Sequence, residues 1–172
     1  MTLGIPHDQA ALASQPATGL FMGAGATREA FRHQDWNASA LGPQAEWPPA
    51  LSSSLLHILW SAFPNLVLWG PDLLVLYNDA YLDLIGDGKL EALGRPAREV
   101  SPRIWEVVAS IHVRVLAGET LSHEDVELTI VRRGRQETVL RTLSFAPMHD
   151  EAGDVGGVLV TVFDSDHVPR AD

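Results

Sequence analysis

The stretch 63–86, FPNLVLWGPDLLVLYNDAYLDLIG, constrains the fold more than any other part of this chain. Two short apolar runs, 66–69 and 73–77, are separated by the sequence Gly-Pro-Asp, which favours a tight turn. Asn78 follows at once and can cap a helix, whose apolar stripe ends before Gly86. The sequence therefore predicts a β-hairpin that leads directly into a short helix.

The segments on either side of this hairpin have equally distinct periods. Apolar residues recur at helical spacing over 48–62, and Ser101 followed by Pro102 is typical of the start of a longer helix that ends at Gly118. Beyond Gly118 the apolar residues alternate with polar ones, with period two. We expect three strands there, at about 126–130, 137–147 and 155–163.

These elements predict an α+β fold. Its five-stranded antiparallel sheet would carry helices on one face, because the helices available to cover it lie between the second and third strands. We expect a flexible N-terminal arm at 1–34, apart from a possible helical turn from Thr27 to Phe31. A cap segment and helix would follow at 35–62, a core at 63–164 and a tail or linker at 165–172.

Composition excludes several classes of function. The 172 residues carry a formal charge of −10, which disfavours binding to nucleic acids and anionic membranes. There is no cysteine, so disulfides, thiolate metal sites and cysteinyl-flavin photochemistry are excluded. No apolar run approaches the roughly 20 residues that a spanning helix needs, and we expect a cytoplasmic protein.

An ordered series of short motifs resembles the PAS domains found N-terminal in bacterial sensor histidine kinases. The series comprises DW at 35–36, LGP at 41–43, WP at 47–48, the S-x-FP…WGP…YNDAY pattern at 61–81, LGRPA at 93–97, IW at 104–105 and SFAPMHDEAGDVGGVL at 144–159. The topology deduced from periodicity agrees with this resemblance. Family members often end in an acidic residue, a spacer and a Thr, whereas this chain has Asp164, Ser165 and Asp166.

The resemblance implies a sensory or regulatory input module that is not an enzyme by itself. Such a module binds a small ligand or a partner and passes a conformational signal to an effector such as a histidine kinase. It also implies a homodimer, which we expect to form partly through the 48–62 helix and the outer face of the sheet. Neither the ligand nor any cofactor follows from the sequence.

Helices that cross one face of a curled sheet leave an interior pocket, and its lining can be predicted. Tyr77, Asn78 and Tyr81 combine apolar bodies with polar tips, although core packing and a helix cap explain them as well. The full set of candidate ligand-binding residues is Trp69, Tyr77, Asn78, Tyr81, Trp105, Ile111, Leu128 and Phe145. No catalytic residue and no metal ligand is predicted.

Three further groups have a structural explanation that we prefer. His112, which could ligate haem, falls about 100° around the helix from Ile111 and is expected at the boundary or surface. His123, Glu124 and Asp125 fit a solvated strand start better than a metal site. Arginines 132, 133 and 135 fit a solubilising turn. Arg141 needs an anionic partner only if it is buried.

Two other classes of protein stay open at this point. One is a cone-shaped α+β enzyme of the isomerase type, which would place a long helix before most of its sheet, whereas two strands precede the main helices here. The other is a ligand-free dimerisation module whose pocket is filled by its own side chains. The apolar residues at inward positions and the lack of a convergent polar cluster favour this second alternative.

Overall fold

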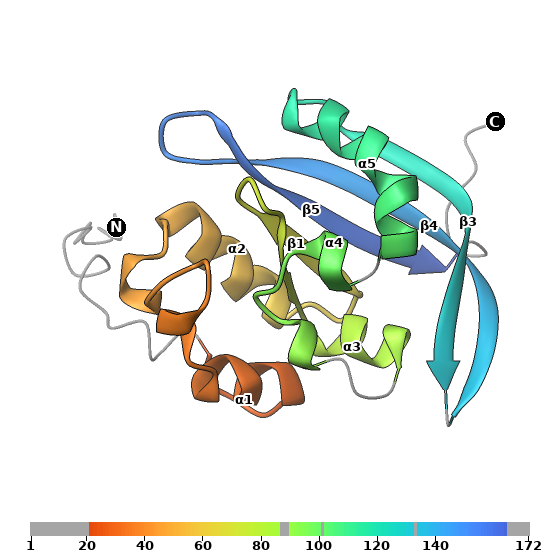
Figure 1. The fold of residues 1–172 in the computed structure, drawn as a ribbon, viewed down its shortest axis with the longest axis horizontal. Coiled ribbons are helices and arrows are strands. Elements are labelled where there is room, and N and C mark those ends of the chain that lie inside the picture. Colours follow the sequence, from red (N-terminus) through yellow and green to blue (C-terminus); the bar gives the residue numbers. More distant parts are fainter. Residues whose placement is uncertain (1–20, 87–89, 101, 133, 165–172) are drawn as a thin grey trace, which may run out of the picture.

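A computed structural model describes residues 21–86, 90–100, 102–132 and 134–164. Its five strands form one antiparallel sheet in the order β2-β1-β5-β4-β3 (Figure 1). The strands are β1 (Asn65–Trp69), β2 (Leu74–Tyr77), β3 (Leu121–Arg132), β4 (Arg135–His149) and β5 (Val155–Asp164). The predicted α+β class and five-stranded sheet are confirmed, and the three C-terminal strands are longer than predicted.

The helices occupy the positions that the sequence indicates. They are α1 (Ala26–His33), α2 (Pro49–Leu59), α3 (Asp79–Ile85), α4 (Ala97–Val100) and α5 (Pro102–Leu116), with 3-10 turns η3 (Trp36–Ala38), η4 (Gln44–Glu46) and η5 (Leu90–Ala92). No described helix combines the length and apolar character needed to cross a membrane. The Ser101 cap, the tail 165–172 and the arm up to residue 20 lie outside the described residues.

The end of the predicted arm is structured, and it packs against the rest of the domain. Phe21 and Phe31 are buried and stack at 4.8 Å between ring centroids, and Trp36 and Trp47 extend this aromatic cluster. The expectation of flexibility up to residue 34 therefore does not hold for 21–34. The possible helical turn from Thr27 to Phe31 lies within α1, and buried aromatic side chains anchor the segment.

Arg28 connects α1 to both α2 and α3. Its guanidinium lies 3.6 Å from the Asp79 carboxylate, donates a hydrogen bond to the Leu59 carbonyl oxygen and sits 4.4 Å from the centroid of the Trp60 ring. The Thr27 amide donates to the same Asp79 carboxylate at 2.8 Å. Because Asp79 is the first residue of α3, the N-terminal segment is fastened to the start of that helix.

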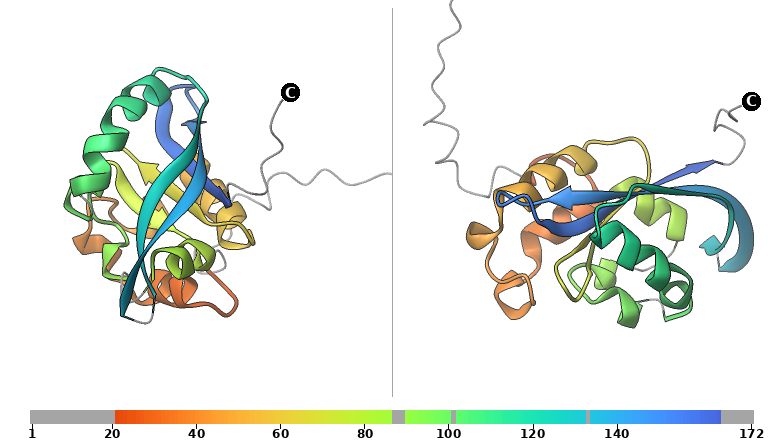
Figure 2. Two further views of the ribbon diagram at one scale, coloured as in Figure 1. Left: turned by 90° about the vertical axis from the view of Figure 1, so that its right-hand side faces the viewer. Right: turned by 90° about the horizontal axis from the view of Figure 1, so that it is seen from above.

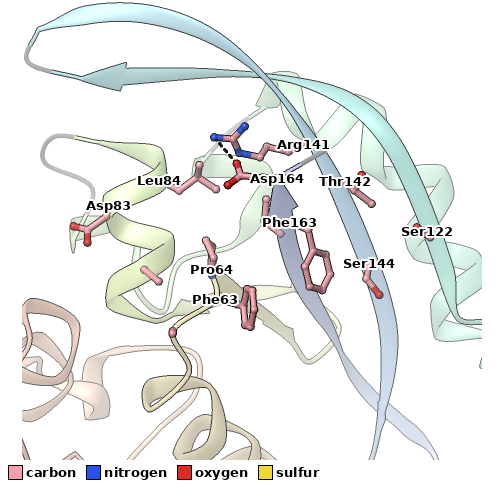
Figure 3. Close-up of a pocket in the computed structure, with 13 residues that line it drawn as sticks. Phe63, Pro64, Asp83, Leu84, Ser122, Arg141, Thr142, Ser144, Phe163 and Asp164 are labelled. Carbon is pink, nitrogen blue, oxygen red and sulfur yellow. Dashed lines mark ion pairs between the residues drawn. The ribbon is translucent and has the colours of Figure 1, made fainter. Parts of the chain in front are cut away.

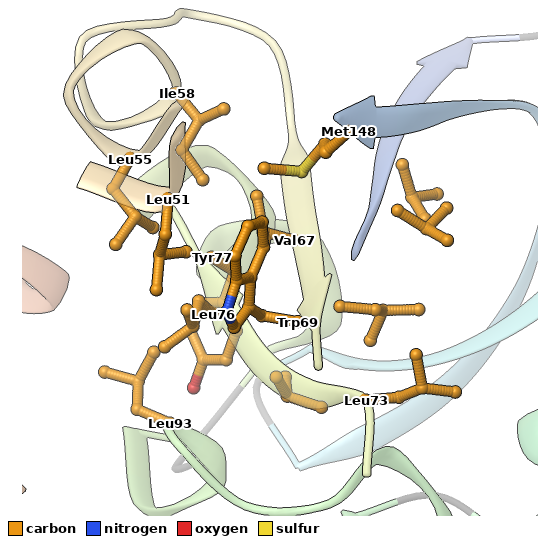
Figure 4. Packing of buried hydrophobic residues seen from close by; sticks show 14 of the residues in the cluster. Leu51, Leu55, Ile58, Val67, Trp69, Leu73, Leu76, Tyr77, Leu93 and Met148 are labelled. Carbon is orange, nitrogen blue, oxygen red and sulfur yellow. The ribbon is translucent and has the colours of Figure 1, made fainter. Parts of the chain in front are cut away.

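The outer face of the sheet is packed directly against α2. Leu51, Leu55 and Ile58 point from that helix toward Val67 and Trp69 of β1 (Figure 4). Figure 2 shows α5 on the side of the sheet opposite to α2, so the sheet has a helix on each face. The helix that precedes the hairpin is the predicted N-terminal cap helix, and it covers the outer face of the two hairpin strands.

Gly156 and Gly157 of β5 provide the room for Trp69. A Cβ atom on Gly157 would lie 2.7 Å from both the Leu68 carbonyl oxygen and Cε3 of Trp69, and one on Gly156 would lie 2.9 Å from the indole. Real Cβ atoms essentially never approach other heavy atoms so closely. The indole therefore rests on bare backbone, and the outer face is filled at this point.

Candidate functional site

The inner face of the sheet and the helices opposite it enclose a cavity of about 110 Å³. Every strand and helices α3, α4 and α5 contribute to its wall. The described lining residues are Leu66, Leu68, Val75, Tyr77, Tyr81, Ile85, Ala92, Ala97, Val100, Trp105, Leu128, Leu143, Phe145, Val160 and Val162. We call this space the inner cavity.

Strand register explains why these side chains converge. Leu66 pairs with Tyr77 and with Val160, and Phe145 also pairs with Val160, so the four side chains share one face of the sheet. Their immediate neighbours along each strand point the other way. Apolar residues at alternating positions of four strands thus form the floor of the inner cavity, and the short helices form its roof.

Tyr77 and Tyr81 supply the phenol groups of the cavity wall. Tyr77 lies at the end of β2 and Tyr81 in the first turn of α3, and their ring centroids are 5.5 Å apart. Burial, followed by the neighbouring Tyr81, raises the pKa of Tyr77, and burial raises the pKa of Tyr81 to about 12. Both phenols are therefore neutral at physiological pH.

Asn78 fixes the position of these tyrosines without itself lining the cavity. Its Oδ1 accepts hydrogen bonds from the amides of Asn65 and Tyr81, each at 3.0 Å, and the second of these caps α3. Its Nδ2 donates to carbonyl oxygens that include those of Ile58 at 2.9 Å and Phe63 at 2.8 Å. One buried amide therefore joins the end of α2, the start of β1 and the start of α3.

The structure brings together five of the eight candidate residues that the sequence suggests. Tyr77, Tyr81, Trp105, Leu128 and Phe145 line the inner cavity. Trp69 lies on the outer face of the sheet, because adjacent residues of a strand point to opposite faces and Leu68 faces inward. Ile111 is buried on α5 but lies outside the described lining. Leu128 is the one aliphatic residue of the described lining that the sequence suggested; the others were missed, although their alternation along β1, β2 and β5 is a usable signal.

His112 is buried, contrary to the expectation from helix geometry. Its side chain is 3% exposed, and neither ring nitrogen has a hydrogen-bond partner in the described part of the chain. Its ring centroid lies 5.6 Å from that of Trp105. Burial lowers the pKa of the imidazole, so it is neutral near pH 7. The residue belongs to the wide buried face of α5, but it is not part of the described cavity wall.

A second, larger hollow opens at the end of β5, where β1 no longer accompanies it (Figure 3). This open groove has a volume of about 960 Å³. It is lined by Ala62, Phe63, Pro64, Ala80, Asp83, Leu84, Ser122, Arg141, Thr142, Ser144, Val162, Phe163 and Asp164. Arg141 forms an ion pair with Asp164 at 3.0 Å, which provides the anionic partner that a shielded arginine requires.

The inner cavity is the better candidate for a ligand site, although the groove is larger. Ligand sites are typically enclosed and apolar, with a few polar groups that orient the bound molecule. The groove is the more open of the two hollows, and its Arg141 is already paired with Asp164. Within the described residues, no three histidine or acidic side chains gather closely enough to hold a metal ion. His123, Glu124 and Asp125 are exposed around a β-bulge.

Comparisons with solved structures identify the fold. The PAS domain of BvgS from Bordetella pertussis matches with a TM-score of 0.51 and 23% identity, over 70% of this chain and 87% of that one. The RsLOV d2 variant matches with a TM-score of 0.52 and 17% identity, over 70% and 69%. A sensory box sensor histidine kinase from Vibrio cholerae has a TM-score of 0.47 and 18% identity, over 66% and 88%.

Other comparisons bear on length and family. This chain covers only 34%, 66% and 63% of the length of the chains in three further light-oxygen-voltage (LOV) protein structures. No curated protein sequence matches this chain. A family model described as the PAS fold matches residues 61–165, which include the whole sheet and the inner cavity. The chain therefore belongs to the PAS family, whose members are sensory domains.

Proposed function

We propose that this chain is the input module of a bacterial signal-transduction protein, most simply a sensor histidine kinase, and that a small ligand in the inner cavity is its signal. The observation that carries the proposal is the apolar space between sheet and helices, with two neutral phenols in its wall. The module has no catalytic role of its own, and the attached effector performs the chemistry in the cytoplasm.

The wall of the inner cavity supports a route from ligand to effector. Val160 and Val162 of β5 contact the cavity, and β5 ends at Asp164, next to the chain that would continue to an effector. A ligand that moves these side chains changes the packing of the last strand. Because a ligand shifts a conformational equilibrium only through its different affinity for two states, the signal requires that cavity occupancy alters β5.

The first test is a native mass spectrum and an absorption spectrum of the same purified sample. The proposal predicts an additional mass of small-molecule size on each chain. A ligand-free mass, combined with unchanged signalling by the intact protein when Leu128→Phe fills the cavity, would contradict it. The matched control is Leu140→Phe, a substitution of the same type on the neighbouring strand at a side chain that is 48% exposed.

A dimerisation module is the second candidate function, and a surface feature favours it. Leu56, Trp60 and Phe63 are exposed on α2 and just beyond it, which places large apolar side chains in contact with solvent near the outer face of the sheet. We propose that two copies associate through this surface, and that the dimer relays the signal whether or not a ligand is bound.

Sedimentation of two matched variants tests the dimer. Leu56→Glu on α2 should convert a dimer at high micromolar concentration into a monomer, because a buried carboxylate at an apolar interface is costly. Leu116→Glu on α5 is the control, since both leucines are 40% exposed. A wild-type monomer, or equal effects of the two substitutions, would refute association through α2.

A further inference from the structure

The size of the inner cavity limits what it can hold. Its volume of about 110 Å³ is smaller than the engineered protein cavity of about 150 Å³ that binds benzene. A flavin or a haem, with three or more fused or linked rings, is several times too large for the cavity in this conformation. The space fits a molecule of about one aromatic ring.

The wall also limits the charge of the occupant. None of the described lining residues is ionisable near neutral pH, and Val162 is the one described residue that lines both hollows. The nearby charges of Asp83, Arg141 and Asp164 belong to the open groove on the far side of that valine. An ionised carboxylate or phosphate in the inner cavity would lose its hydration without gaining a counter-charge from the described wall, which is strongly unfavourable.

The phenols provide a polar contact for a neutral ligand. The tyrosine pair and the indole N–H of Trp105 are the polar side-chain groups of the described wall. A phenol hydroxyl can donate a hydrogen bond to a carbonyl or hydroxyl oxygen and can also accept one. Both phenols keep their protons near neutral pH because burial opposes ionisation. Tyr81 therefore suits a single uncharged oxygen atom rather than an anionic group.

We propose that the inner cavity binds an uncharged, mainly apolar molecule about the size of one aromatic ring, oriented by one oxygen atom at the tyrosine pair. This inference rests on the proposed function, because it names the class of ligand for the same site. It separates the chain from sensors that need an extended cofactor, and it predicts that shape and neutrality, rather than charge recognition, determine which compounds bind.

Acetophenone and benzoate are suitable probes, because both carry one benzene ring with a small carbonyl-containing substituent and only benzoate is anionic. Their affinities for the full chain are measured by calorimetry and by amide chemical-shift changes. We expect acetophenone to bind and benzoate to bind at least about 100-fold more weakly, because its carboxylate must be desolvated. Leu128→Phe should weaken acetophenone binding at least about 10-fold, since the added ring occupies the same space. Leu140→Phe should leave it unchanged.

Ala97→Leu serves as a second cavity-filling variant if Leu128→Phe does not fold. Acetophenone binding that both filling variants leave intact would overturn the assignment to this cavity. Benzoate binding as tight as that of acetophenone, or no acetophenone binding at millimolar concentration, would overturn the ligand class. The proposed function fails separately, when cavity filling leaves signalling by the intact protein unchanged.

Discussion

The two faces of the sheet are built from alternate residues of the same strands, yet one is filled and the other is hollow. On the outer face, Trp69 lies against the bare backbone of Gly156 and Gly157, with α2 packed over it. On the inner face, Leu66 and Leu68 line the inner cavity. The difference shows that apolar patterning alone does not decide whether a face becomes solid core.

The helices on the two faces account for this difference. The outer face is covered by α2, a helix of 11 residues that presents a continuous stripe of leucines and isoleucine. The inner face is covered by three separate helices, α3 with 7 residues, α4 with 4 residues and α5 with 15 residues. Three separate helices joined by turns cannot follow a twisted sheet as closely as one continuous helix, so their side chains leave space between the layers.

Trp69→Ala should cause the largest loss of stability, because it leaves a void in the filled outer face. The indole is 8% exposed, and truncation of a buried tryptophan costs about 3–5 kcal/mol of unfolding free energy. Urea unfolding measures the loss. Trp60→Ala is the control, since that side chain is 64% exposed and loses mainly its contact with Arg28, worth about 0.5–2 kcal/mol. Equal losses in the two variants would contradict the packing argument.

Adding atoms should have opposite consequences on the two faces. Gly157→Ala forces a Cβ against the Leu68 carbonyl oxygen and Trp69, and overpacking of this kind costs about 1–3 kcal/mol. Leu128→Phe extends into open space and should change the unfolding free energy by less than about 1 kcal/mol. Thermal and urea unfolding of both variants measure the contrast. Destabilisation of Leu128→Phe as large as that of Gly157→Ala would mean that the inner cavity has no room for the added ring.

A pH titration should reveal the buried imidazole of α5. Burial lowers the pKa of His112, so the folded protein binds this proton less readily than the unfolded chain, whose histidine pKa is about 6.5. The stability that depends on a neutral His112 is therefore fully present above about pH 6.5. The free energy of unfolding decreases as the pH falls below that value. The slope from one proton is at most about 1.4 kcal/mol per pH unit.

The matched variants for this titration are His112→Phe and His123→Phe. His112→Phe should flatten the acid limb of the stability curve, since a phenyl ring keeps the contact with Trp105 and takes up no proton. His123→Phe should retain the limb, because that histidine lies on the exposed start of β3. The same slope in His112→Phe and wild type would show that other groups produce the acid sensitivity.

Much of the fold could be predicted because local signals agree with it. The Gly-Pro-Asp turn, the Asn78 cap and the change from helical to alternating period each depend on a few neighbouring residues. The position of Trp69 was harder to predict, because its face depends on strand register relative to Gly157, which is distant in sequence. The burial of His112 likewise depends on how wide a face of α5 meets the sheet.

The candidate site was predictable only in part for the same reason. Aromatic residues attract notice in a sequence, and Tyr77, Tyr81, Trp105 and Phe145 do line the inner cavity. Most of its aliphatic wall and its volume arise from the gap between three separate helices and a twisted sheet, which no local pattern encodes. The open groove lies where β5 continues beyond Thr161, the residue that pairs with the first residue of β1. Its charged rim is therefore visible only in three dimensions.

The Arg141–Asp164 ion pair of the open groove should have the smallest effect on stability. It tests whether the groove differs from the inner cavity in its access to water. Arg141 and Asp164 lie 3.0 Å apart, but the aspartate is exposed to water, which screens the attraction. A double-mutant cycle with Arg141→Gln and Asp164→Asn, measured by urea unfolding, should give a coupling of about 0.2–1 kcal/mol that decreases with added salt. A coupling above about 2 kcal/mol that resists salt would instead mean that the groove excludes water. In that case both hollows would be closed, and neutrality rather than enclosure would be what distinguishes the inner one.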